Sequence, residues 1–139
     1  MDFNGVKAAV FHNNQLLVYL RDDKPGLRFA NMWDFPGGGR EGEETVFETL
    51  QRETQEEFGI SITPEMVFWQ KAYPAMHDHN LQAFACGVEI PAELAESIVF
   101  GDEGQRWQWM SVEEVLSRDD VVPFLKHRLS DCLKERNGE

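Results

Sequence analysis

The segment from Gly38 to Ile60 constrains this chain more than any other part of its sequence. It reads GGREGEETVFETLQRETQEEFGI and places Glu53, Glu56 and Glu57 within five residues of one another. At about 100° per residue of helix, these three side chains share about one third of the circumference. Like charges at this spacing repel one another. A sequence that keeps them together is typical of a site that holds a cation.

The apolar residues of the same segment predict an amphipathic helix that packs on a sheet. The apolar stripe consists of Val46, Phe47, Leu50 and Phe58. Glu57 falls inside this stripe, and Glu53 borders it. Burying a bare carboxylate is costly unless the carboxylate is paired or bound to a metal. A solvated charged face explains Glu48 but not Glu57, so the pattern favours a metal site over a plain surface helix.

Glycines mark both ends of the helix. Residues 36–39 read Pro-Gly-Gly-Gly and predict a loop that adopts positive φ and brings backbone carbonyls close to a ligand. The helix is expected to begin at Glu44 or Thr45, since acidic residues in the first turn suit the helix dipole. Gly59 is expected to end it as the glycine after the last turn. A new strand is expected from Ile60.

The charged residues and glycines of this segment match a known signature. The pattern is G-x5-E-x7-R-E-U-x-E-E-x-G-U, in which U is aliphatic, and the matching residues are Gly38, Glu44, Arg52, Glu53, Thr54, Glu56, Glu57, Gly59 and Ile60. Thr54 is the single departure, and it changes packing rather than chemistry. The chain therefore resembles the Nudix hydrolases. The preceding run Trp33–Gly37 also resembles the sequence that leads into this box in the family.

The resemblance implies a metal site in the box. In this family the box glutamates bind divalent metal ions, which carries over to Glu53, Glu56 and Glu57. The backbone carbonyl of Gly37 is expected to be a further ligand. Mg²⁺ suits such a set of oxygen donors, and Mn²⁺ is the alternative.

The expected catalytic residues are Glu53, Arg52, Glu44 and Glu103. Arg52 is expected to fix a glutamate through a bidentate pair rather than to clamp the substrate. Residues 102–105 read Asp-Glu-Gly-Gln and resemble a segment of the MutT-like branch, where the glutamate joins the metal site. The alternative interpretation of Glu103 is an exposed acid in a loop.

Residues near the glycine-rich loop are candidates for substrate binding: Arg21, Arg28, Trp33, Phe35 and Gly38. The two arginines flank the loop that enters the site, where they could meet phosphates, and solvated arginines are the alternative. Trp33 and Phe35 lie beside the glycines, so contact with substrate and packing in the core are both open for these rings.

Length and charge set further bounds. The chain of 139 residues is expected to form one domain, residues 1–139. Its net charge of −12 and pI of about 4.7 argue against binding to a nucleic-acid polymer, because no basic stripe is present to neutralise a phosphate backbone. Cys86 and Cys132 lack metal-site spacing and indicate reduced thiols in a cytoplasmic protein. No signal peptide and no membrane-spanning run are expected.

Strand and helix patterns alternate along the chain and predict an α/β fold with a mixed sheet. Strands are expected at residues 6–11, 16–20, 66–73, 81–90 and 106–110, and helices at 45–58, 111–116 and from 122 onward. His77 and His79 are expected in a solvated turn rather than in a metal site. The resemblance implies the α/β/α sandwich of the Nudix family.

The resemblance also implies a metal-dependent hydrolase of a nucleoside diphosphate linked to another group. The favoured reaction splits a nucleoside triphosphate, normal or modified, into a monophosphate and pyrophosphate, because the segment around Glu103 is MutT-like. A nucleotide sugar, ADP-ribose or a dinucleoside polyphosphate is the alternative substrate. A non-catalytic nucleotide-binding module is the alternative class, although such modules have usually lost box carboxylates. The expected partner is a small nucleotide, without a membrane, and a homodimer stays open.

Overall fold

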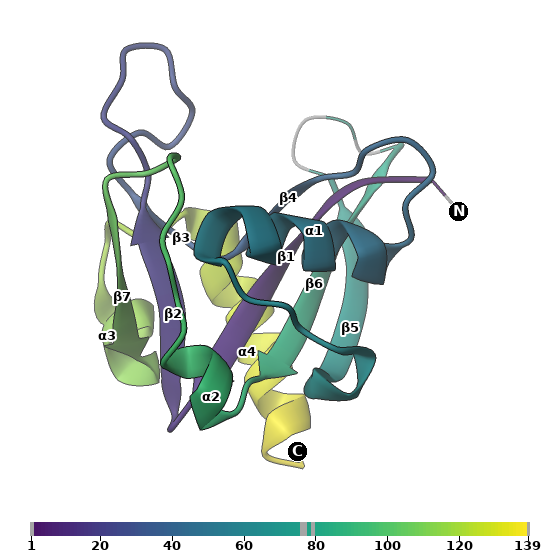
Figure 1. Cartoon of the computed structure of the whole chain (residues 1–139). Coiled ribbons are helices and arrows are strands. Elements are labelled where there is room, and N and C mark those ends of the chain that lie inside the picture. The colour runs from purple at the N-terminus through teal and green to yellow at the C-terminus, as the bar shows by residue number, and fades with distance from the viewer. Residues whose placement is uncertain (1, 76–77, 79, 139) are drawn as a thin grey trace.

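The computed structural model describes residues 2–75, 78 and 80–138, which form one mixed sheet with helices on both faces (Figure 1). The strands are β1 (Phe3–His12), β2 (Gln15–Leu20), β3 (Trp33–Asp34), β4 (Gly37–Gly39), β5 (Val67–Pro74), β6 (Gln82–Glu89) and β7 (Arg106–Ser111). The helices are α1 (Val46–Phe58), α2 (Ala92–Ala95), α3 (Val112–Ser117) and α4 (Pro123–Arg136), with a short 3-10 helix at Pro64–Met66. The predicted α/β class with a mixed sheet is confirmed.

The order of strands places β1 at the centre of the sheet. The main path runs β3-β2-β1-β6-β5, while β4 pairs with β1 and β7 pairs with β2. Only the β1–β6 pair is parallel among the strands of the described residues. The far end of β1 pairs with β2, whereas its beginning, Gly5 to Lys7, pairs with β4. β1 and β2 therefore diverge, and β4 takes the place of β2 beside the first part of β1.

Side chains alternate between two cores along β1. Val6, Ala8 and Val10 belong to the core under α1. Ala9 and Phe11 belong to a second core with α4 on the opposite face. This alternation follows from the strand period of two, and it builds the layered sandwich seen in Figure 1.

Helix α1 has a defined boundary at each end. The Thr45 hydroxyl accepts from the Glu48 amide at 3.1 Å, and the Glu48 carboxylate accepts from the Thr45 amide at 2.9 Å. This capping box places the start at Thr45 rather than at Glu44. Gly59 ends the helix with a φ of 66°, as predicted.

Two expectations about local structure were wrong. The glycine run was expected to be a loop, but Gly37–Gly39 forms strand β4 against β1. The strands approach so closely that a Cβ on Gly37 would lie 2.1 Å from the Val6 carbonyl oxygen, and Gly37 has a φ of 134°. The strand expected from Ile60 is absent, and residues 60–63 are irregular. The Ile62 carbonyl accepts from Gln51 Nε2 at 3.0 Å instead of from a neighbouring strand.

Some short elements were missed by the sequence analysis, and one predicted turn cannot be compared with the structure. The sequence did not reveal the short elements β3 and α2. The predicted turn with His77 and His79 lies at residues that are outside the described part. Among the helices of the described residues, none has both the length and the apolar character needed to cross a membrane.

Candidate active site

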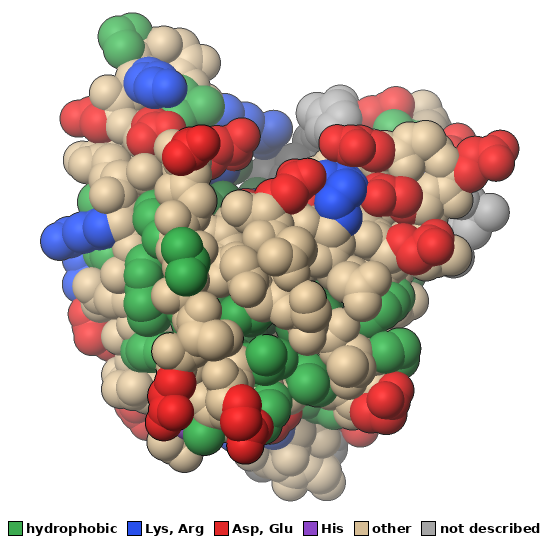
Figure 2. Space-filling model, viewed as in Figure 1, with side chains coloured by type: hydrophobic (Ala, Val, Ile, Leu, Met, Phe, Trp, Pro, Cys, Tyr) green, Lys and Arg blue, Asp and Glu red, His purple; other side chains and the backbone are tan. Residues whose placement is uncertain are grey.

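Five acidic side chains line one cavity of about 190 Å³. Glu53, Glu56 and Glu57 come from α1, whereas Asp102 and Glu103 come from the loop before β7. Figure 2 shows acidic side chains gathered along the upper edge of the face that α1 covers. The structure thus brings Glu103 to the box glutamates, as the MutT-like segment predicted.

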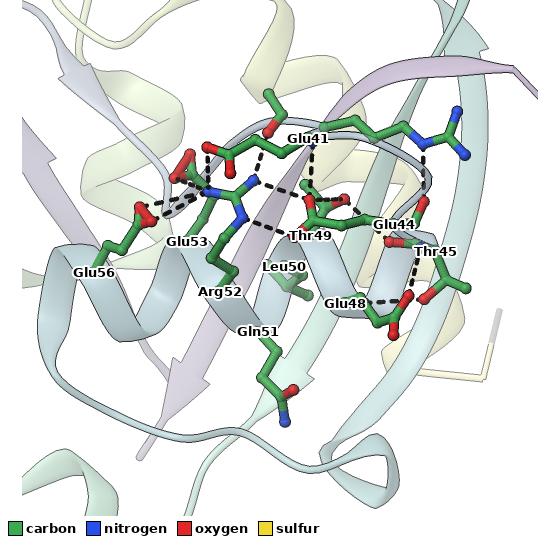
Figure 3. Close-up of polar contacts among 12 residues, drawn as sticks. Glu41, Glu44, Thr45, Glu48, Thr49, Leu50, Gln51, Arg52, Glu53 and Glu56 are labelled. Carbon is green, nitrogen blue, oxygen red and sulfur yellow. Dashed lines mark hydrogen bonds and ion pairs between the residues drawn. The ribbon is translucent and has the colours of Figure 1, made fainter.

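Arg52 holds the acidic residues of the box in place (Figure 3). Its Nε donates to Glu44 Oε2 at 2.8 Å, and its Nη2 donates to Glu44 Oε1 at 3.0 Å, which is the bidentate pair expected from the sequence. Nη1 donates to Glu53 at 3.2 Å and to Glu56 at 3.3 Å. Nη2 also donates to the Gly39 carbonyl at 2.7 Å, so Arg52 ties α1 to β4.

Glu44 serves as the anchor for Arg52. Its carboxylate also accepts from the Glu41 amide at 2.9 Å and from the Thr49 hydroxyl at 3.1 Å. The hydrogen bonds from Arg52, followed by that from the Glu41 amide, lower the pKa of Glu44 to about 2. A carboxylate with so many donors is already satisfied, so Glu44 positions Arg52 rather than binding a metal.

The pKa values of Glu57 and Glu53 are raised, whereas that of Glu44 is lowered. The Glu57 carboxylate accepts from the Gly37 amide at 2.9 Å, yet burial raises the pKa of Glu57 to about 8. Burial also raises the pKa of Glu53. The charge of Arg52 partly offsets this rise, and the charge of Glu56 adds to it. These carboxylates are therefore partly buried beside other negative charge, which a bound cation would relieve.

The donor set fits a hard divalent cation. All five lining side chains offer carboxylate oxygens, which Mg²⁺ and Mn²⁺ accept. Within residues 2–75, 78 and 80–138, no three acidic, histidine or cysteine side chains converge tightly enough to hold a metal by themselves. This agrees with the usual Mg²⁺ site, in which one or two carboxylates are completed by water and substrate phosphates.

A buried charge network that the sequence did not reveal lies beside the predicted ligand Gly37. Lys7 Nζ donates to Asp34 Oδ2 at 3.1 Å, to the Phe35 carbonyl at 3.2 Å and to the Gly37 carbonyl at 3.3 Å. Burial alone would lower the pKa of Lys7, but Asp34 holds it above its usual value. A lysine inside the apolar run of β1 was the available signal, because a charge there requires a buried partner.

The predicted substrate residues fall into different places. Arg21 donates to Asp34 at 2.9 Å and lines a cavity of about 320 Å³ that Glu103 also lines. Arg28 and Gly38 line another cavity, described below. Trp33 and Phe35 are only 2% and 3% exposed and pack in the core with α4. The structure therefore favours packing over substrate contact for these two rings.

The third cavity, of about 260 Å³, lies between β1, β4, β6 and α4. Phe29 and Phe124 supply aromatic walls, and Arg28 and Arg128 supply positive charge. We call it the aromatic cavity.

Gly38 in β4 lies next to residues of both the aromatic cavity and the acidic cavity. Gly38 lines the aromatic cavity, and a Cβ on Gly38 would lie 1.5 Å from Glu53 Oε2. The missing side chain of Gly38 thus makes room for the Glu53 carboxylate.

Comparison with known proteins agrees with this geometry. A model of the NUDIX domain matches residues 3–132. The chain belongs to the Nudix family. This Nudix chain is 43% identical over 123 residues to the human protein "Nucleoside diphosphate-linked moiety X motif 6", and the match covers 86% of the chain but only 38% of the human protein. It is 29% identical over 118 residues to 8-oxo-dGTP diphosphatase of Escherichia coli, covering 85% of the chain and 87% of that protein.

Solved structures show the same fold. A MutT protein from Methanosarcina mazei superposes with a TM-score of 0.73 at 20% identity, covering 97% of this Nudix chain and 96% of that one. A bifunctional NMN adenylyltransferase/ADP ribose pyrophosphatase from Francisella tularensis, complexed with AMP and a manganese ion, gives a TM-score of 0.76 at 21% identity over 97% of this chain and 42% of that one. The recognition of a MutT-like Nudix domain is confirmed. At the level of the family, the expectation of a pyrophosphohydrolase is also confirmed.

Proposed function

We propose that this Nudix domain hydrolyses a nucleoside triphosphate, normal or modified, to a nucleoside monophosphate and pyrophosphate in the presence of Mg²⁺. The observation that carries the proposal is the position of Gly38, which lines the aromatic cavity and lies beside Glu53 of the acidic cavity. Phosphates would lie with the metal at the acidic residues, and the nucleoside would lie among the rings. Mn²⁺ is the alternative ion, supported by the manganese named in the Francisella complex.

Glu53, Glu56, Glu57 and Glu103 would hold the metal ions. The Gly37 carbonyl, which also accepts from Lys7, would be a further ligand. Mg²⁺ in this position neutralises phosphate charge and lowers the pKa of a bound water. The carboxylates of Glu53 and Glu103 face the same cavity, and each is a candidate to take the proton from the attacking water. Arg52 keeps Glu53 and Glu56 in position.

The size of the aromatic cavity favours a substrate with one nucleoside. At about 260 Å³ it is smaller than the roughly 300–1,000 Å³ of sites for drug-sized ligands. One nucleoside suits this volume better than the two of a dinucleoside polyphosphate. The name of the E. coli relative, 8-oxo-dGTP diphosphatase, also supports a triphosphate.

Other substrates are alternatives because the names of similar proteins refer to different reactions. The Francisella protein is named an ADP ribose pyrophosphatase, and a similar fold from C. elegans is named an Ap4A hydrolase, with a TM-score of 0.68 at 16% identity. A nucleotide sugar, ADP-ribose or a dinucleoside polyphosphate is therefore the second proposal. A non-catalytic nucleotide-binding module is the remaining class.

The deciding experiment is a substrate panel with Mg²⁺ or Mn²⁺, in which the phosphorus products are separated. Release of pyrophosphate and a monophosphate from triphosphates supports the proposal. Turnover of only sugar or dinucleoside substrates supports the second proposal. Absence of any turnover, together with thermal stabilisation by nucleotides, supports the binding module. Loss of turnover in Glu53→Gln and in Glu103→Gln, compared at several pH values, separates the two candidate bases.

The oligomeric state and the cellular location of the protein are also proposals. A homodimer is tested by light scattering of the purified chain. A cytoplasmic location agrees with Cys86 and Cys132, which are both free and buried.

A further inference from the structure

Arg128 is a buried guanidinium in the middle of α4. The residue is only 6% exposed, and its Cζ lies 4.5 Å from the ring centre of Phe124 and 4.7 Å from that of Tyr73. Among the described residues, no carboxylate or carbonyl forms a hydrogen bond with this guanidinium. Arg136, in the last turn of the same helix, instead donates to Glu89 at 3.2 Å.

The environment of Arg128 is unfavourable for a purely structural arginine. Burial lowers the pKa of Arg128, and Tyr73 only partly offsets this. Lys7 lines the same aromatic cavity, but Asp34 balances its charge. Contact with aromatic rings offsets only part of the desolvation of a cation. A leucine or methionine would fill this position at a lower cost, so the guanidinium is suited to a ligand.

The shape of the aromatic cavity indicates the chemistry of that ligand. The rings of Phe29 and Phe124 are 6.0 Å apart at 60° to each other, next to Arg128. Phe29 has a φ of 56°, a conformation that is unfavourable for an aromatic residue and that concentrates at functional sites. Flat apolar walls beside a buried guanidinium suit an aromatic ring that carries a hydrogen-bond acceptor.

We propose that Arg128 determines base specificity by donating hydrogen bonds to a carbonyl oxygen of the nucleobase in the aromatic cavity. Guanine, hypoxanthine and uracil offer such an oxygen, and adenine does not. This inference rests on the proposed function, because it assigns the base of the same substrate. The phosphates do not compete for Arg128, since the metal-binding carboxylates lie across Gly38 and apolar rings surround the guanidinium.

The test compares ITP with ATP, two purine triphosphates that differ at C6, a carbonyl in ITP and an amino group in ATP, and at N1, which carries a proton only in ITP. Wild-type protein is expected to prefer ITP by about 10- to 100-fold in kcat/KM, the range of one good two-donor contact to a base. Arg128→Met is expected to bring the ratio of the two values close to one. Arg136→Met is the matched control on the same helix and is expected to keep the wild-type ratio.

Folding and activity are separated by further measurements. Should Arg128→Met fail to fold, Arg128→Lys replaces it, and the ratio is expected to fall at least several-fold because an ammonium lacks the planar fork of donors. Binding of IMP and AMP, measured by calorimetry without metal, gives a second readout that does not need turnover. Tighter binding of IMP that is lost on substitution of Arg128 supports the inference.

Three results would overturn it: equal use of ITP and ATP by the wild-type protein, a wild-type ratio in a folded Arg128 variant, or a preference that follows the number of phosphates instead of the base. Failure of the proposed function looks different. In that case no triphosphate is hydrolysed at all, while the IMP and AMP binding experiment still decides the role of Arg128.

Discussion

Lys7 Nζ lies 3.3 Å from the carbonyl oxygen of Gly37, so a buried cation from β1 holds the backbone that leads into the acidic cavity. The same nitrogen pairs with Asp34, which is 3% exposed at its side chain. Arg21 and the Tyr19 hydroxyl also donate to Asp34, at 2.9 and 3.2 Å. The network fixes the segment between β3 and β4 against β1, and the site depends on it.

Replacing Lys7 tests this network. Lys7→Met is expected to lower the free energy of unfolding by about 3 kcal/mol, because Asp34 loses one of its two cations in a buried position. Turnover is expected to fall as well, since Gly37 is no longer held. Lys71→Met is the control, because Lys71 is 52% exposed in its pair with Asp131 and is expected to cost at most about 1 kcal/mol. Equal losses in urea unfolding would contradict the network.

Gly38 and Gly39 form a matched pair for the acidic cavity. In Gly38→Ala the new Cβ would lie 1.5 Å from Glu53 Oε2, so the flexible carboxylate must move. A displacement of this size is expected to lower kcat by roughly 100-fold while the fold is retained. In Gly39→Ala the nearest heavy atom is the Asn4 carbonyl oxygen at 3.8 Å, which is an ordinary contact. Steady-state kinetics that show similar rates for the two variants would contradict the placement of Glu53.

The lowered pKa of Glu44 predicts that the folded protein loses stability at acidic pH. Its pKa in the folded protein is lowered to about 2, mainly by Arg52, so its stabilising contribution is complete above the unfolded pKa near 4.5. That contribution is lost as the pH falls from about 4.5 to about 2. Glu44→Gln is therefore expected to be less stable than the wild type at pH 7, with a difference that disappears near pH 2. Thermal unfolding across this range checks it, with the exposed Glu43→Gln as control. A difference independent of pH would exclude the Arg52 pair as its cause.

Metal binding is expected to stabilise the folded chain. Mg²⁺ at 100 times its dissociation constant adds about 2.7 kcal/mol to the free energy of unfolding if it binds only the folded state. Glu57→Gln is expected to abolish this response and to lower the rate by several orders of magnitude. Glu48→Gln, on the exposed face of α1, is expected to keep the metal response. A melting temperature of Glu57→Gln that still rises with Mg²⁺ would remove Glu57 from the metal site.

The sequence predicted the box helix and its acidic cluster well, because local rules decide them. The spacing of Glu53, Glu56 and Glu57 and the stop at Gly59 need only helix geometry. Glu103 required the family resemblance, since nothing local brings its loop to α1. The roles of Lys7 and Arg128 escaped because each depends on a cavity built from distant strands and helices.

The glycine run is a place where prediction from local sequence failed. Glycines suggested a flexible loop, yet the same lack of side chains allows β4 to lie against β1 as a strand. Trp33 and Phe35 looked available for substrate because they flank this run. Their burial follows from the tertiary packing of α4, which no short window of sequence contains.

The parallel pairing of β1 with β6 has a consequence for the order of assembly. Phe3 lies opposite Gln82, so β1 waits for a strand that lies much further along the chain. Contacts between such distant segments form slowly, because a long loop must close before they stabilise anything. Until β6 emerges from the ribosome, one edge of β1 is exposed to other nascent chains. The acidic cavity is thus completed only after Glu103, which follows β6 in the sequence, has been translated.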